Sequence, residues 1–380
     1  MTGNEPSFTL GIEEEYLLVD LETMDLANDP PPSLMEECRK RCNRDEQVSR
    51  ELLRSQIEIG TRKCSSIKGA RDDLTQLRRV VVEVAEQHGL APIAASTHPF
   101  AHWSEQKQTA RQRYSNLAAQ MAATARRMLI CGMHVHVGID DDELRIDLLS
   151  QMTYFLPHLL LLSTSSPFWE GENTGLKSYR LTVFDALPRT GLPEHFSSYG
   201  EYQRHVDVLV SAGLIEDATM IWWDLRPSAR YPTLETRIFD MCTDIDDAVS
   251  LAAMTMCILR RLYRLRLNNQ RWRRYNRMLI NENRWRAMRY GSDEGLLDLA
   301  KGEIVEFKQL LEEILEEIDE DAQFLGCEAE VAHARTILQR GTSAHQQVNV
   351  YDQAIASGKD REAALRDVVA FLIAGTRRGI

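Results

Sequence analysis

Four short stretches of this chain carry acidic or imidazole side chains at alternate positions, with apolar side chains between them. The stretches are residues 11–18, 55–60, 132–138 and 233–239. The residues that recur at these positions are Glu13, Glu15, Glu58, His134, His136, Glu235 and Arg237. Residues two apart in a β-strand share a face, so such side chains would project together. The pattern predicts strands that present acids and imidazoles on one side of a sheet.

Carboxylate oxygens with a few imidazole nitrogens suit Mg²⁺ or Mn²⁺, and such ions beside a nucleotide support phosphoryl transfer. A half-exposed antiparallel sheet also alternates polar with apolar residues, and that interpretation is the better one for any single strand. Two facts favour the metal interpretation for the set. Glutamate is depleted in strands, and like charges crowded on one face repel unless cations neutralise them.

Familiar nucleotide and zinc motifs do not account for these residues. The chain has no Gly-x-x-x-x-Gly-Lys-Ser/Thr and no Gly-x-Gly-x-x-Gly, so any ATP is not held by a P-loop. His134 and His136 could form half of a zinc site, but their likely companion ligands are glutamates, which favour magnesium over zinc. A metal-dependent hydrolase that uses this histidine pair, a carboxylate and a bound water is an alternative interpretation. Activity without ATP would distinguish such a hydrolase from an enzyme of phosphoryl transfer.

The composition is that of an ordinary globular protein. The chain has 380 residues, is 43% hydrophobic and carries a net charge of −12, which disfavours nonspecific nucleic-acid binding. An arginine-rich stretch at 260–289 could be an RNA-binding helix, but we expect its arginines to pair with the acids of 312–321 or with phosphate. Seven scattered cysteines, an odd number, indicate reduced thiols in a cytoplasm. The sequence predicts no signal peptide and no membrane span.

Hydrophobic periodicity predicts mixed strands and helices followed by a helical region. The predicted strands are 8–20, 51–61, 90–96, 128–139 and two within 222–240. The predicted helices are 33–41, 67–88, 109–125, 141–162, with a kink at Pro157, and 196–212. From residue 244 onward the chain reads as mainly helical, with an amphipathic helix at 306–321. We expect an α+β fold with a mostly antiparallel sheet, in one catalytic domain over 1–380 with its α+β core at 8–240 and its helical part at 244–380.

Several motifs, taken together, resemble the bacterial carboxylate–amine ligases of the glutamate–cysteine ligase type 2 group. They occur in the family's order, from residue 11 to 344: GIEEEYLLVD, ELLRSQIEIGT, HPF, GMHVHVGID, SSPFWEGENTGLKSYR, LP, WWDLRPS, TLETRIFD and GTSA. The resemblance implies a glutamine synthetase-like catalytic fold, in which a curved sheet forms an active-site funnel flanked by helices. It also implies an enzyme that phosphorylates a carboxylate with ATP and lets an amine displace the phosphate.

The same resemblance assigns roles position by position. Metal ligands are matched by Glu13, Glu15, Glu58 and Glu235, more weakly by Glu51, and His134 matches a ligand of metal or nucleotide phosphate. Arginines that face substrate or phosphate are matched by Arg180 and Arg226, with Arg226 also a nucleotide-binding candidate, and Arg237 would face the same pocket. The implied cofactors are ATP and Mg²⁺, with Mn²⁺ able to replace it.

The expected reaction is amide formation through an acyl phosphate, with glutamate and cysteine as the default substrates. The chain has Glu172-Asn173 where many relatives have a basic or small residue and then Asp, which leaves the substrate open. We expect the segment 169–180 to cover the site against water and the enzyme to be a homodimer. A nucleotide-binding protein without turnover is the third hypothesis, although every expected acid is present.

Overall fold

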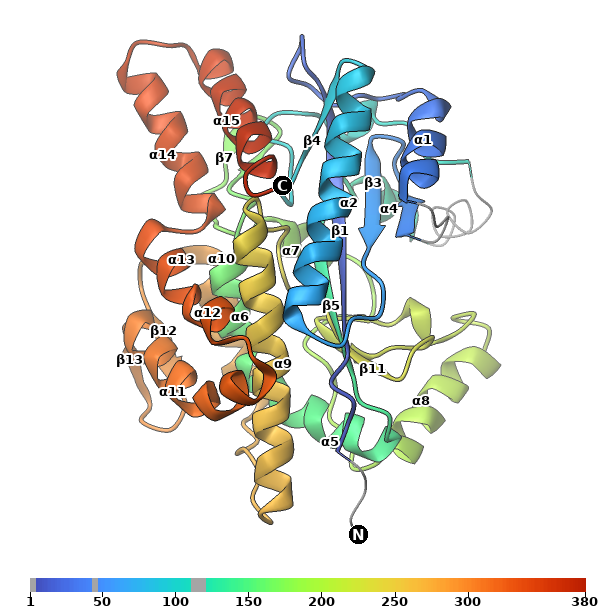
Figure 1. Ribbon diagram of the computed structural model, residues 1–380, viewed down its shortest axis with the longest axis vertical. Coiled ribbons are helices and arrows are strands. Elements are labelled where there is room, and N and C mark those ends of the chain that lie inside the picture. Colours follow the sequence, from blue (N-terminus) through green and yellow to red (C-terminus); the bar gives the residue numbers. More distant parts are fainter. Residues whose placement is uncertain (1–4, 43–46, 111–120) are drawn as a thin grey trace.

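A seven-stranded antiparallel sheet occupies the N-terminal part of the computed structural model, which describes residues 5–42, 47–110 and 121–380 (Figure 1). Its strand order is β10-β11-β5-β1-β3-β2, and β4 pairs with the far end of β1. The strands are β1 (Leu10–Asp20), β2 (Val48–Arg50), β3 (Gln56–Gly60), β4 (Leu90–Ile93), β5 (Met133–Gly138), β10 (Leu225–Pro227) and β11 (Thr233–Thr236). The expected α+β class with a mostly antiparallel sheet is confirmed.

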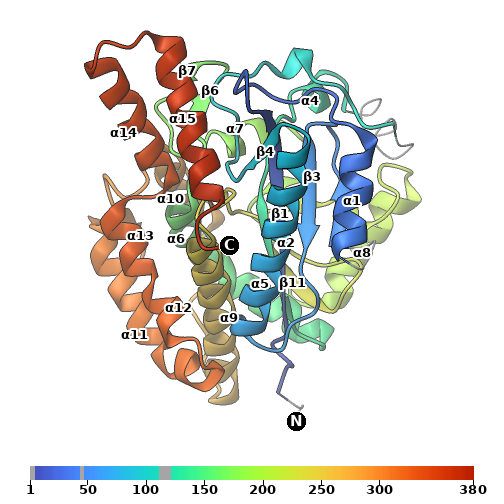
Figure 2. The ribbon, with the colours of Figure 1, turned by 45° about the horizontal axis from the view of Figure 1, so that its top comes forward.

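Two long helices cover one face of this sheet (Figures 1 and 2). Helix α2 (Ile67–Gln87) begins at Ser66, whose side chain accepts a hydrogen bond from the Gly69 amide, and α9 (Ile245–Leu267) begins at Asp244 in the same way. Alternate side chains of β1 are buried against these helices from Leu10 onward. The intervening residues of β1 therefore face the opposite side of the sheet, which carries the functional candidates.

A fully buried ion pair ties β1 to α2 on the covered face. Arg78 of α2 donates to both carboxylate oxygens of Glu14, at 2.6 and 2.7 Å, and to the main-chain carbonyls of Cys242 and Thr243. The Tyr16 hydroxyl also donates to Glu14. Because every partner of this carboxylate is fixed, the pair holds β1 in one orientation, with Glu13 and Glu15 on the other face.

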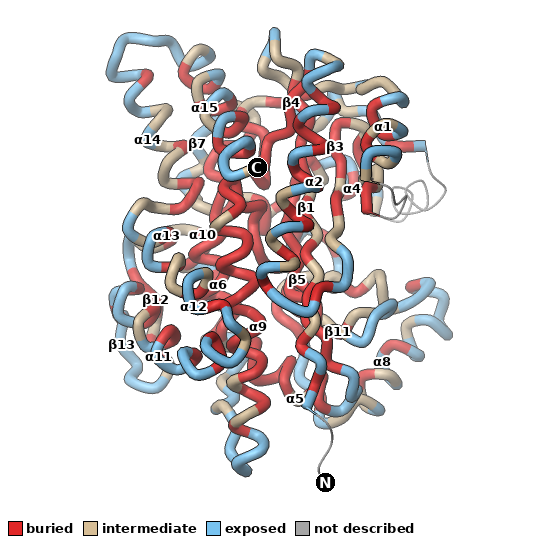
Figure 3. Tube along the Cα trace, in the orientation of Figure 1, coloured by how far each residue is buried: buried red, intermediate tan, exposed pale blue. Residues whose placement is uncertain are grey.

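The remaining helices flank this core. They are α1 (Pro32–Cys42), α4 (Ala123–Arg126), α5 (Asp142–Met152), α6 (Leu156–Ser163), α7 (Arg180–Phe184), α8 (Tyr199–Ser211), α10 (Arg277–Tyr290), α11 (Phe307–Leu325), α12 (Glu328–Ala332), α13 (Ala334–Arg340), α14 (Ser343–Ala356) and α15 (Arg361–Thr376). The helices α11, α12 and α13 contact α9, and α15 contacts β4. One buried apolar cluster extends from Phe8 to Ile373, and Figure 3 shows it passing through the sheet, α6 and α9.

Short strands complete the chain. They are β6 (Phe168–Trp169) with β7 (Glu172–Asn173), β8 (Thr190–Gly191) with β9 (Trp222–Trp223), and β12 (Leu296–Asp298) with β13 (Glu303–Val305). The pair β8 and β9 is parallel, unlike the main sheet. None of the three pairs was predicted as such, because two or three residues are too few to display a period.

Several predicted boundaries were wrong. The helix expected over 141–162 is broken by a 3₁₀ turn at Thr153–Phe155, so Pro157 lies in the first turn of a new helix and does not kink a continuous one. Most of the helix expected over 109–125 lies outside the described residues. The segment after Thr236 leaves the sheet, and Glu51 lies before β3 and not in it.

The arginine-rich stretch pairs with acids, as expected. Arg260 and Arg264 of α9 bind the buried Asp321 of α11, and Arg261 binds Glu317. These contacts join two packed helices and engage the cations internally. In the described part of the chain, no helix combines the length and apolar character that crossing a membrane requires. All seven cysteines are free thiols.

Candidate active site

The strand register gathers the functional candidates on the uncovered face of the sheet. Residues directly opposite in an antiparallel pair share a face. Glu13 lies opposite His134, Glu15 opposite Glu58, and Glu235 lies between His136 and Arg226. The register therefore brings residues from five strands, β1, β3, β5, β10 and β11, to one surface.

One cluster consists of the carboxylates of Glu15, Glu51 and Glu58. Each offers an oxygen, and these oxygens all lie within 4.8 Å of one another. Ser49 of β2 donates to Glu58 at 3.0 Å, and the Gly132 amide donates to Glu15 at 2.7 Å. Burial, and then the charges of Glu51, Glu13 and Glu15, raise the pKa of Glu58 well above its ordinary 4.5. Three carboxylates this close repel strongly unless a proton or a cation lies among them.

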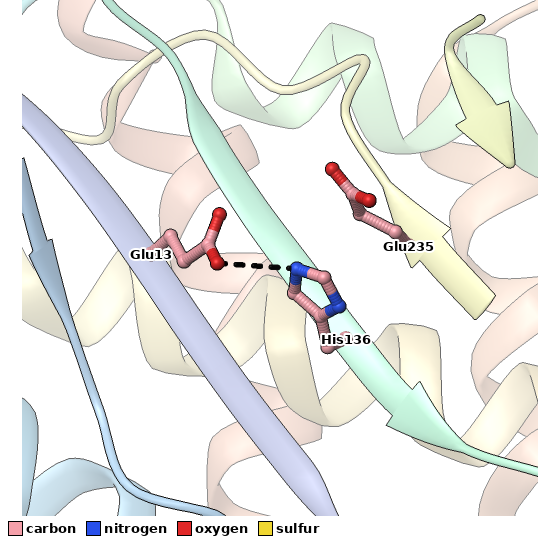
Figure 4. Close-up of side chains that lie close together, drawn as sticks. All are labelled: Glu13, His136 and Glu235. Atoms are coloured by element: carbon pink, nitrogen blue, oxygen red, sulfur yellow. Dashed lines mark ion pairs between the residues drawn. The ribbon is translucent and has the colours of Figure 1, made fainter. Parts of the chain in front are cut away.

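The second cluster consists of Glu13, His136 and Glu235, which come from β1, β5 and β11 (Figure 4). Their ligand atoms also lie within 4.8 Å of one another, and His136 Nε2 is 3.4 Å from Glu13. Burial opposes ionisation of Glu13, but hydrogen bonds with His134 and His136 hold its pKa well below 4.5. Glu13 is therefore a carboxylate at neutral pH, and it would be available to a cation.

The two histidines differ in their surroundings. His134 Nδ1 lies 3.1 Å from Glu13, and burial, followed by the charge of Arg237, lowers its pKa, so its ring is neutral at pH 7. His136 Nδ1 lies 3.0 Å from the Thr233 hydroxyl. Burial would lower the pKa of His136, but its contact with Glu13 and the negative charges of Glu235 and Glu13 together outweigh burial and raise it.

Glu235 joins the second cluster to two arginines. Arg226 donates to both of its oxygens, at 2.9 and 3.0 Å, and Arg237 also donates to it. Burial opposes ionisation of Glu235, but the charges of Arg237 and then Arg226 hold its pKa well below the ordinary value. A single buried carboxylate thus keeps two guanidinium groups at the edge of the site.

Arg180 brings a third buried guanidinium into the cavity. It begins α7 and is 3% exposed. Its terminal nitrogens donate to the carbonyls of Arg237 and Ile238 at 3.3 and 3.4 Å, and its Nε has no hydrogen-bond partner among the described residues. Burial lowers the pKa of Arg180. A buried cation held this weakly is suited to an anionic ligand.

All of these side chains line one cavity of about 790 Å³. This volume is within the usual range for small-molecule sites. Its wall also includes apolar side chains, namely Leu52, Met128, Ile130, Phe184, Leu187, Met220 and Trp222. The cavity thus offers anionic groups, cationic groups and an apolar surface to a single ligand set.

The donor sets fit divalent cations of the magnesium type. Glu15, Glu51 and Glu58 present only oxygens, the ligands that Mg²⁺ and Mn²⁺ prefer. In the second cluster His136 Nε2 faces Glu13 at 3.4 Å, so one nitrogen could join the two carboxylates as a ligand there.

Every residue predicted for the site lines this cavity, although its function stays a prediction. These residues are Glu13, Glu15, Glu51, Glu58, His134, Arg180, Arg226, Glu235 and Arg237. The ligase prediction placed His134 among the ligands, whereas the structure groups His136 with two glutamates. The shared face of the two histidines was the signal that could have included His136.

The segment expected to cover the site does not do so in this structure. Of residues 169–180, only Arg180 lines the cavity. Glu172 pairs with Arg361 of α15, and Trp169 is buried against Tyr179. The Glu172–Arg361 ion pair ties the β6–β7 hairpin to α15, and no residue of that hairpin lines the cavity.

Comparison with known proteins identifies close relatives. The profile of glutamate-cysteine ligase family 2 matches residues 9–370. A protein of Rhodospirillum rubrum named "Putative glutamate--cysteine ligase 2" is 60% identical over 374 residues, which cover 98% of this chain and 96% of that one. A protein of the same name from Jannaschia is 53% identical, over 98% of this chain and 97% of that one.

Two solved structures share the fold. A glutamate–cysteine ligase from Francisella tularensis in complex with AMP has a TM-score of 0.66 at 15% identity, over 97% of this chain and 89% of that one. A bifunctional glutathione synthetase from Pasteurella multocida has a TM-score of 0.69 at 14% identity, over 97% of this chain and 53% of that one. At such identities the similarity concerns the fold alone, and it confirms the glutamine synthetase-like class predicted from the sequence.

Proposed function

Since this chain belongs to the glutamate–cysteine ligase family 2, a family of ATP-dependent ligases, we propose that it joins a small-molecule carboxylate to an amine through an acyl phosphate. The observation that carries the proposal is the pair of clusters, Glu15-Glu51-Glu58 and Glu13-His136-Glu235, in one cavity with buried arginines. Such a cavity can hold a triphosphate, its cations and a carboxylate together.

The chemistry explains why both charge types are required. A carboxylate resists attack by an amine, because oxide would have to leave. In the proposed reaction a carboxylate oxygen attacks the γ-phosphorus of ATP, and ADP leaves. The amine then attacks the acyl carbon, loses a proton, and phosphate leaves. Divalent cations, when bound, would neutralise charge on the phosphates and the carboxylate.

The chain's own residues would divide this work by charge. The clustered glutamates and His136 would hold the cations. Arg180 would orient the carboxylate of the acyl donor, because its guanidinium is buried in the cavity and has an unused donor. Arg226 and Arg237 would face the transferring phosphoryl group, with Glu235 fixing their positions.

Glutamate and cysteine are the first substrates to test. The relatives' name supplies that pair, and a cavity with both apolar and charged walls is compatible with amino-acid substrates. A cytoplasmic location and a homodimer remain part of the proposal. The hydrolase alternative is not retained, because family membership places the chain among ligases.

The test is a panel of carboxylates and amines, assayed for ADP release with ATP and Mg²⁺ and for the amide by mass spectrometry. We expect ADP release that depends on both an acyl donor and an amine. Product formation without ATP would contradict the proposal.

The Glu13→Gln variant is the first control for this assay. It should abolish amine-dependent ADP release and leave the circular dichroism spectrum unchanged, because Glu13 is on the cavity face of β1 and not in the apolar core. Retained turnover would remove Glu13 from the metal site.

A further inference from the structure

Gly132, directly before β5, is a position where a side chain would collide with Arg180. A Cβ atom built on Gly132 would lie 2.3 Å from Arg180 Nη2 and 2.8 Å from its Cζ. Both distances are far below van der Waals contact, so the guanidinium would have to move. The Arg180 guanidinium therefore occupies space that is free only because residue 132 has no side chain.

The same glycine also contacts the carboxylate cluster. Its amide donates to the Glu15 carboxylate at 2.7 Å, and its carbonyl accepts from the Glu15 amide at 3.2 Å. Gly132 thus touches the proposed substrate-binding arginine on one side and a proposed metal ligand on the other. One backbone position fixes the spacing between them.

Asp240 holds the main chain of Arg180 in place through Ser166. This buried carboxylate accepts hydrogen bonds from Ser166 and Ser178 hydroxyls at 2.7 and 2.8 Å. The Ser166 oxygen in turn accepts from the Arg180 amide at 3.1 Å. Asp240 also pairs with Gly132 in an isolated β-bridge, so the two contacts on Arg180 belong to one connected unit.

We propose that Gly132 and Asp240 are positioning residues that together fix the Arg180 guanidinium at a set distance from the Glu15 carboxylate. Gly132 provides the space for the guanidinium, and Asp240 anchors the backbone from which it extends. The inference rests on the proposed function in that Arg180 binds the acyl donor. It adds that the KM for that donor is determined by two residues with no contact to substrate.

The test is a double-mutant cycle between Gly132→Ala and Arg180→Lys, with KM and kcat measured for the acyl donor. Lysine lacks Nη2, the atom nearest to the added methyl group, and its flexible end can turn away from residue 132. We expect Gly132→Ala to raise the KM for the acyl donor at least about tenfold in the natural background. In the Arg180→Lys background it should add less than about twofold, because coupled residues are not additive.

Gly11→Ala is the matched control. Gly11 lies on the face of β1 that carries Glu13 and Glu15. A Cβ atom on Gly11 would lie 3.7 Å from the Cβ of His136, which is an ordinary van der Waals contact. We expect this variant to leave KM and kcat unchanged. Equal effects of Gly132→Ala in both Arg180 backgrounds, or an equal rise in the KM for ATP, would overturn the inference.

Two further measurements test the inference if Gly132→Ala does not fold or if the protein shows no ligase activity. If Gly132→Ala does not fold, Ser166→Ala is the substitute, because it removes the acceptor of the Arg180 amide. This variant should raise the KM for the acyl donor about threefold. An unchanged KM would contradict the inference. A crystal structure of Gly132→Ala tests the inference even if the protein has no ligase activity. A displaced guanidinium there supports the positioning even if ligation is absent and the proposed function fails, and an unmoved one refutes it.

Discussion

Replacing Glu58 with glutamine should stabilise the metal-free protein and remove the stabilisation that Mg²⁺ provides. The variant keeps the size of the side chain but removes one of three carboxylates whose oxygens lie within 4.8 Å. Without a cation, ionising Glu58 beside the other two carboxylates costs stability, and the neutral glutamine removes that cost. With a cation present the same substitution removes a ligand. The change in stability caused by Glu58→Gln should therefore be positive without Mg²⁺ and negative with Mg²⁺.

The structure sets the size of the effect. At the 4.8 Å limit on the oxygen separations, two unit charges repel by about 3.5 kcal/mol at an effective dielectric constant of ~20, and by about 1 kcal/mol in bulk water. The cavity is open to solvent, so we expect an intermediate gain of about 2 kcal/mol for metal-free Glu58→Gln. For a chain of this length that corresponds to a rise in melting temperature of about 2–3 °C.

The gain should also depend on pH. The pKa of Glu58 is raised in the folded protein, so ionising it costs stability only above its ordinary pKa of 4.5. The cost grows as the pH rises toward the folded pKa. The difference between variant and natural protein should therefore be near zero at pH 4 and increase toward pH 8.

The assay is thermal unfolding by circular dichroism in EDTA and in a Mg²⁺ titration at pH 8. At 100 times its dissociation constant Mg²⁺ should stabilise the natural protein by about 2.7 kcal/mol and the variant by far less. The exposed Glu36, replaced by glutamine, is the matched control and should change neither value. If Glu58→Gln is less stable in EDTA, or gains as much from Mg²⁺ as the natural protein, the reasoning is refuted.

Two further variants test the support of the site. Arg78→Met leaves the Glu14 carboxylate buried without its cation, and urea unfolding should show a loss of about 3–5 kcal/mol; an unchanged midpoint would contradict the described pair. Glu235→Gln leaves Arg226 and Arg237 without their shared carboxylate, and kcat should fall at least about 100-fold with an intact fold, whereas turnover near that of the natural enzyme would refute its place in the site.

The faces of the strands could be read from the sequence, because the alternation of side chains is a local property of an extended chain. Glu13 and Glu15 were placed together on that ground, and so were His134 and His136. The register between strands is not local. The pairing of Glu15 with Glu58 depends on how strands far apart in the chain pack their apolar faces.

The residues that sequence reasoning did not assign act through tertiary contacts. Gly132 matters because Arg180, 48 positions later in the sequence, occupies the space beside it. Glu51 was assigned only through the family resemblance, because it joins its cluster from a segment outside any strand, where the residue pattern shows no period. The break at Thr153–Phe155 was also invisible, since both helices that flank it are buried and apolar on wide faces.

The most direct test of the account is anomalous diffraction from crystals grown with Mn²⁺ and an unreactive ATP analogue. The account predicts Mn²⁺ coordinated by carboxylate oxygens of Glu15, Glu51 and Glu58, with the triphosphate in the same cavity. Mn²⁺ and nucleotide bound elsewhere, with these three carboxylates in contact with water alone, would contradict it.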